Sequence, residues 1–177
     1  MTQISIEGYL TQGKLEKAIK SLVDPADWIG REVRISPASL KRWDFSFKTN
    51  HLIYVVEFDG DRHYRDSLTI KNDREKDLVA IGLGHEVVRV PYWVQLTTET
   101  LRHYFNITAD VNQDFPHGFI TTKFFPASFC ELGVERFSKE LIALPFNAQK
   151  SVVKSLQDRA TEYGLEFVLP EKLRTNF

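Results

Sequence analysis

Residues 43–60, WDFSFKTNHLIYVVEFDG, contain the pattern that decides the fold of this chain. The segment 43–48 alternates apolar and polar side chains, which is typical of a strand with one buried face. The segment 52–59 is rich in β-branched and aromatic residues on both faces and predicts a central strand. Turn residues at 49–51 separate the two segments, so we expect an antiparallel hairpin.

Three carboxylates lie at one end of this hairpin. Glu57 and Asp59 are two residues apart on one strand and therefore share a face. If the hairpin loop has four residues, Lys48 stands opposite Ile53. Asp44 then faces Glu57, with about 5 Å between their β-carbons. Like charges at this distance raise one another's pKa, and a bound divalent cation removes the conflict.

The three carboxylates therefore indicate a Mg²⁺ site that could hydrolyse phosphodiesters. The alternative is that they are solvated charges, because Asp-Gly is a common turn pair and Asp44 begins a strand. Two features favour the metal site. Glu57 extends an apolar strand, and His63 lies just after the turn, close enough to reach the same place.

The flanking segments alternate between helical and extended patterns, which predicts an α/β fold. The first expected helix is capped by Thr11 and stops at Asp24-Pro25, and a short strand over 32–36 follows it. After the hairpin we expect a helix over 67–83 and a strand over 86–91. A last helix is capped by Thr97 or Thr98 and runs through 105.

The composition changes near Asn106, because 10 of the 13 Phe residues lie at position 105 or later. We therefore predict two parts, 1–105 and 106–177. The second part is expected to begin with a loop, to form helices over 126–144 and from Asn147 to Gly164, and to end in a strand over 165–169. We expect this mostly helical, Phe-rich extension to pack on the core, with DNA recognition or dimerisation as alternative roles.

The charge balance excludes a generally basic nucleic-acid binder, since 23 Lys and Arg stand against 24 Asp and Glu. A single cysteine excludes a disulfide framework. The longest apolar runs have about six residues, whereas a membrane span needs ~20. We therefore expect a cytoplasmic protein that does not cross a membrane.

The string W-D-F-x(11)-E-F-D-G-x-x-H-Y resembles the PD-(D/E)xK nuclease superfamily, with most likeness to very-short-patch-repair-like endonucleases. Further matching positions are Arg74, Leu78, Gly82 and Arg89, and the resemblance covers about residues 15–95. It implies a restriction-endonuclease-like core, in which helices flank a mixed sheet and Asp44 and Glu57 bind metal. The implied activity is a Mg²⁺-dependent endodeoxyribonuclease acting on double-stranded DNA, with Mn²⁺ as a substitute ion. Cutting both strands would be easiest for a homodimer.

One departure concerns the lysine of the motif, whose place is taken by Asp59. Asp59 is then a third metal ligand or an acidic replacement found in some relatives. The cation that stabilises the transition state would come from the next helix, where Lys71, Arg74 and Lys76 are candidates. We select Lys71 as the relocated lysine. The same departure favours a rival function, a catalytically inactive nuclease fold that binds DNA or protein.

His63 is assigned to proton transfer or phosphate contact, and an ordinary loop histidine is the alternative. Arg74 could bind phosphate or pair with Asp77 or Glu75. The segment 31–48 carries five basic and two acidic residues. We therefore assign Arg42 and Lys48 to the DNA backbone, with a solvated rim as the alternative. Glu16 is expected on the solvated surface.

Overall fold

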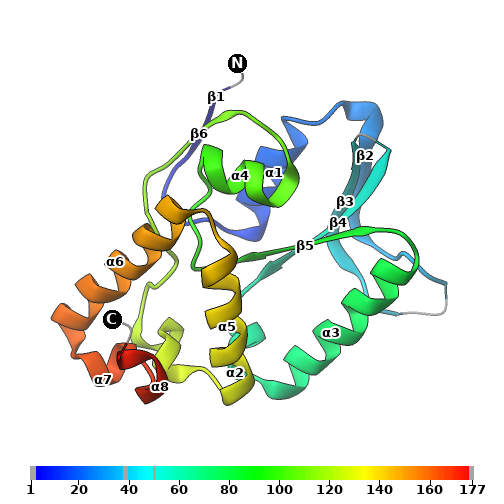
Figure 1. Cartoon of the computed structure of the whole chain (residues 1–177). Helices are drawn as coiled ribbons and strands as arrows, with labels where there is room; N and C mark the ends of the chain where they lie inside the picture. Colours follow the sequence, from blue (N-terminus) through cyan, green and yellow to red (C-terminus); the bar gives the residue numbers. More distant parts are fainter. Residues whose placement is uncertain (1–2, 38–39, 50, 176–177) are drawn as a thin grey trace.

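A four-stranded mixed sheet lies at the centre of the computed structural model, which describes residues 3–37, 40–49 and 51–175 (Figure 1). Its strands are β2 (Trp28–Val33), β3 (Trp43–Thr49), β4 (Leu52–Asp59) and β5 (Glu86–Pro91), in that order across the sheet. The first three are antiparallel, and β5 runs parallel to β4. The expected α/β class with a mixed sheet flanked by helices is confirmed.

The register of the hairpin is the expected one. Lys48 pairs with Ile53, and Phe45 pairs with Val56 at the other end of the ladder. Extending this register by one residue sets Asp44 opposite Glu57. The alternation in β3 fails at its first residue. Phe45 packs in one hydrophobic cluster with Phe47, whereas Trp43 packs with Val55 on the other face of the sheet.

Helices cover both faces of the sheet (Figure 1). On one face, α1 (Gln12–Lys20) and α4 (Thr98–Phe105) bury leucines against Phe45 and Phe47. Thr11 and Thr97 cap these two helices as predicted. On the other face, α3 (Ser67–Gly82) follows the short helix α2 (Arg62–Arg65) and packs Ala80 against the sheet.

The later part of the chain packs on this core. It contains α5 (Glu131–Ala143), α6 (Phe146–Tyr163), α7 (Leu165–Val168) and α8 (Glu171–Arg174), and 3-10 turns at Thr122–Phe124 and Pro126–Ser128. A further 3-10 turn, at Pro25–Asp27, directly precedes β2. Tyr64 and Trp93 share one hydrophobic cluster with Phe125 and Phe137. In addition, β1 (Gln3–Ile6) pairs in parallel with β6 (Asp110–Gln113), so the packing crosses residue 105 in two places.

Several local predictions are wrong. The expected loop after Asn106 contains β6, whose partner β1 lies more than 100 residues earlier and left no local signal. The segment 165–169 forms the helical turn α7, which buries Val168 against the Phe-rich cluster. The strand expected over 32–36 ends at Val33. Asn147 lies inside α6, and its amide bonds Glu99 instead of capping the helix.

Within the described residues, every helix is too short or too polar to cross a membrane.

Candidate functional site

The open end of the β3–β4 hairpin brings two acids and a lysine together. Lys76, from α3, places Nζ 2.7 Å from Oε2 of Glu57 and 2.6 Å from the carbonyl oxygen of Arg42. Next to them, the backbone N–H of Phe58 donates to Oδ2 of Asp44 at 2.8 Å. The Lys76 and Glu57 side chains are only 9% and 15% exposed. The site is therefore a largely desolvated group of two carboxylates and one ammonium.

The carboxylates at this site resist ionisation. Burial raises the pKa of Glu57 to about 7, and the charge of Asp44 adds to the effect, although Lys76 and Arg89 oppose it. Burial also raises the pKa of Asp44, against the hydrogen bond from Phe58. Two buried acids thus share the nearest cation, Lys76, and a further positive charge beside them would favour their ionised forms.

The donor set at Asp44 and Glu57 fits a hard cation. Each carboxylate uses one oxygen for a protein hydrogen bond. Within the described part of the chain, the other oxygen, Oδ1 of Asp44 or Oε1 of Glu57, accepts no hydrogen bond and can bind a cation. Mg²⁺ binds to one or two carboxylates and keeps its other positions for water and phosphate oxygens. These two oxygens belong to side chains on neighbouring antiparallel strands.

Asp59, which is fully buried, belongs to a second ion network. Oδ1 of Asp59 accepts from Nη1 of Arg89 at 2.8 Å and lies 3.2 Å from Nδ1 of His63. Oδ2 pairs with Nη2 of Arg136, which reaches in from α5. Both oxygens are therefore occupied by cationic side chains, and Asp59 does not fit a metal ion in this arrangement.

Asp73 ties the same network to α3. It lies 2.7 Å from Nδ1 of His63 and 3.1 Å from Nη1 of Arg136. Burial would raise the pKa of Asp73, but the hydrogen bond with His63 and the charge of Arg89 bring it below its usual value. Although one ligand atom each from Asp59, His63 and Asp73 lies within 4.8 Å of the others, the arginines bind the two carboxylates.

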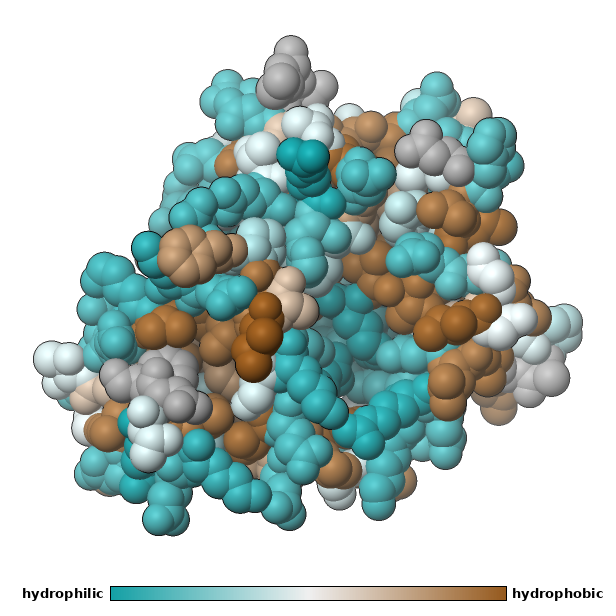
Figure 2. Space-filling model, in the orientation of Figure 1, coloured by the Kyte–Doolittle hydropathy of each residue, from teal (hydrophilic) through white to brown (hydrophobic). Residues whose placement is uncertain are grey.

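Arg89 links Asp59 to Asp77 of α3. Its Nε donates to Asp77 at 2.9 Å, while Nη1 bonds Asp59. Its Nη2 lies 2.9 Å from Oδ1 of Asp77 without the alignment of a hydrogen bond, so Nε makes the stronger contact. A cavity of about 400 Å³ opens over this network between α3 and α5, and hydrophilic side chains line the hollow there (Figure 2).

The cation at the site is Lys76 and not the selected Lys71. Lys71 is exposed, and five residues of an α-helix turn it about 140° away from Lys76. Arg74 is exposed and, within the described residues, forms no ion pair. Its expected partners bind elsewhere, since Asp77 pairs with Arg89 and Glu75 lies 3.7 Å from Lys41.

The remaining assigned residues are spread over the molecule. Arg42 is exposed beside the site, and its carbonyl oxygen holds Lys76. Lys48 is exposed near the turn of the hairpin, about 13 Å along β3 from Asp44. The surface placement of Glu16 is wrong, because Glu16 is 8% exposed and pairs with Arg31 at 2.7 Å.

Sequence reasoning missed Arg136 entirely. Arg136 lies 77 residues after Asp59, on a helix with no chemical motif. The sequence does show a basic residue next to Phe137, on the side of α5 that is buried. A basic residue beside an apolar one is too common in helices to indicate a functional site.

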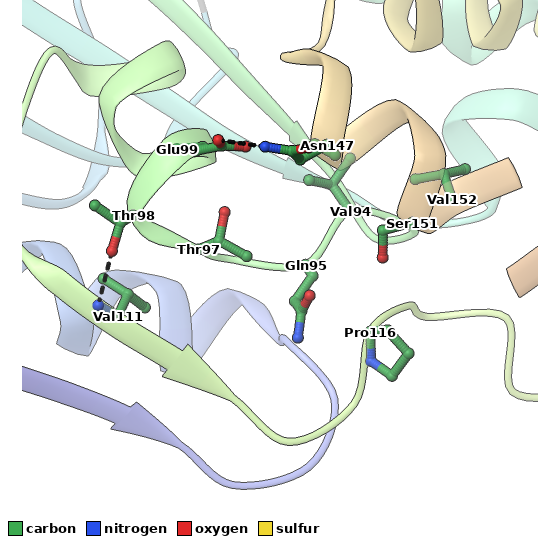
Figure 3. A pocket seen from close by; sticks show the side chains of 11 residues that line it. Val94, Gln95, Thr97, Thr98, Glu99, Val111, Pro116, Asn147, Ser151 and Val152 are labelled. Atoms are coloured by element: carbon green, nitrogen blue, oxygen red, sulfur yellow. Dashed lines mark hydrogen bonds between the residues drawn. The ribbon is translucent and has the colours of Figure 1, made fainter. Parts of the chain in front are cut away.

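A second cavity lies away from these groups, at the first turns of α4 and α6 (Figure 3). It measures about 350 Å³, and the hydrogen bond from Asn147 to Glu99 lies at its edge. Apolar side chains such as Val94, Val111 and Val152 line much of it. None of the assigned site residues lines this cavity.

Comparison with family models, curated proteins and solved structures finds no match to this chain.

Proposed function

We propose that this chain is a metal-dependent endodeoxyribonuclease with a restriction-endonuclease-like core. One observation supports the proposal above the others. Asp44 and Glu57, on adjacent antiparallel strands, each keep one carboxylate oxygen available beside the buried ammonium of Lys76. Acids held in this way, with a fixed cation next to them, suit hydrolysis of a phosphodiester.

In this proposal Asp44 and Glu57 hold Mg²⁺, or Mn²⁺ in its place. The bound ion would polarise the phosphate and lower the pKa of a water molecule. Lys76 supplies a fixed positive charge to the phosphate oxygens as negative charge develops in the transition state. Lys76 thereby takes the role of the motif lysine that Asp59 replaces, and that we had assigned to Lys71. Asp59 acts at a distance, by fixing Arg89.

The proposed substrate is double-stranded DNA. Arg42 borders the site, and Arg74 on α3 forms no ion pair with any residue that the structure describes, so both are suited to contact backbone phosphates. Lys48 lies farther along the sheet and would contact a more distant phosphate. A homodimer would bring two such sites to the two strands of one duplex.

A metal titration with a defined duplex tests this proposal. We expect cleavage that requires Mg²⁺ or Mn²⁺, stops with a chelator and disappears in Glu57→Ala. Glu86→Ala is the matched control, because Glu86 is exposed on the neighbouring strand. Single-stranded, hairpin and mismatched DNA and an RNA duplex define the substrate. Absence of cleavage on all of them, with folded protein and both metals, would refute the proposal.

The rival function is a DNA-binding or protein-binding module without catalysis. The ion pairs of Asp59 with Arg89 and Arg136 favour it, because they complete the network with protein groups alone. Such a module would bind duplex DNA equally well in chelator and in Mg²⁺, and would bind it unchanged in Glu57→Ala.

A further inference from the structure

The ammonium of Lys76 is held on more than one side. Two hydrogen bonds go to Glu57 and to the carbonyl oxygen of Arg42. An ammonium group has three N–H donors, and this side chain is only 9% exposed, so water has little access to it. The centroid of the Trp43 ring lies 4.2 Å from Nζ. The negative face of an indole attracts a cation at this distance.

Trp43 lies beside Lys76 because the alternation of side chains between the two faces of β3 is interrupted at this residue. Trp43 and Phe45 should share one face, but Trp43 packs with Val55 and Ala80 on the face covered by α3. Trp43 is 1% exposed, so its ring is fixed by packing. Any large apolar side chain would fill this space, whereas the contact with Lys76 requires an aromatic face.

We infer that Trp43 is a positioning residue, which uses its indole face to hold the ammonium of Lys76 against Glu57. The inference rests on the proposed function only where it concerns catalysis. The contact itself stands on the geometry. Arg89 also lies over this ring, with Cζ 5.6 Å from the centroid. One side chain thus contacts the cation of each group of acids.

Two substitutions separate the aromatic face from the volume of the side chain. Trp43→Phe keeps a π face in a smaller side chain, and Trp43→Met has a volume near that of Phe without a π face, so the comparison of the two variants isolates the aromatic face. The readout is the exchange of the Lys76 ammonium protons with water, followed by ¹⁵N–¹H NMR of the full chain. We expect about a twofold to thirtyfold faster exchange in Trp43→Met, and a smaller change in Trp43→Phe.

Trp28→Met is the matched control, because Trp28 lies 5.3 Å from Nζ of Lys20 on a different part of the sheet. It should leave Lys76 unchanged. Equal exchange rates in folded Trp43→Met and the parent would overturn the inference, as would equal effects of Met and Phe. If Trp43→Met does not fold, Trp43→Leu, which also lacks a π face, takes its place, and an exchange rate equal to that of the parent overturns the inference.

Cleavage kinetics test the effect of Trp43 on catalysis. In Trp43→Met we expect kcat to fall by about twofold to thirtyfold with KM unchanged, and Trp43→Phe should restore part of the loss. A parent protein that cuts no substrate would refute the proposed function while the exchange rates still decide the role of Trp43. A parent that cuts, with kcat unchanged in Trp43→Met, would refute the positioning role alone.

Discussion

Nζ of Lys76 lies 2.7 Å from Oε2 of Glu57, although the two residues belong to a helix and a strand and are 19 positions apart. This contact places a cation beside the carboxylate of Glu57. It also distinguishes Lys76 from Lys71, the lysine that sequence position alone favoured.

Replacing each of these two lysines by methionine tests which one acts as the catalytic cation. Lys76→Met should lower kcat by about 100-fold to 1,000-fold, because it removes a fixed charge beside the reacting phosphate. Lys71→Met should leave cleavage unchanged, since Lys71 faces solvent on the opposite side of α3. Single-turnover cleavage of a duplex measures both. The reverse pattern would restore Lys71 as the catalytic cation.

The stability of the metal-free protein should fall as pH rises from about 4.5 to about 7. In this window Glu57 is ionised in the unfolded chain, while burial keeps it protonated in the folded protein. The folded state then binds more protons, so raising the pH favours unfolding. The shift corresponds to about 3 kcal/mol. Thermal melting at several pH values should show a flatter profile in Glu57→Gln. An identical profile in parent and variant would contradict the raised pKa.

Asp59→Asn should destabilise the fold by about 3–5 kcal/mol, because it removes the shared partner of two buried arginines, Arg89 and Arg136. The loss should be the same with chelator and with Mg²⁺. Urea denaturation in both conditions measures it. If Asp59→Asn instead keeps its stability and weakens Mg²⁺ binding by calorimetry, Asp59 is a metal ligand after all.

Gly133→Ala should prevent α5 from docking on α2. A β-carbon at Gly133 would lie 1.7 Å from the carbonyl oxygen of Tyr64, which the backbone cannot avoid without moving. Loss of this contact would also withdraw Arg136 from Asp59. Gly82→Ala is the control, because a β-carbon there meets nothing within 4 Å and helix propensity favours alanine by up to about 1 kcal/mol. We expect a melting temperature lowered by several degrees in the first variant and unchanged or raised in the second.

Local features of the sequence predict the elements near the site. The length of the loop between the two strands sets the β3–β4 register that brings Asp44 opposite Glu57, because loop length fixes which residues of a hairpin pair. Capping residues likewise placed α1 and α4, because they satisfy N–H groups within their own turn.

Which charges meet depends on long-range packing. Lys76, Arg89 and Arg136 reach the acids from three separate elements, and their pairings depend on helix rotation and docking that no local pattern encodes. The β1–β6 pair likewise joins segments more than 100 residues apart. Such contacts form because burial leaves each charged group and each strand edge in need of a partner, and the compact chain offers that partner from a distant position.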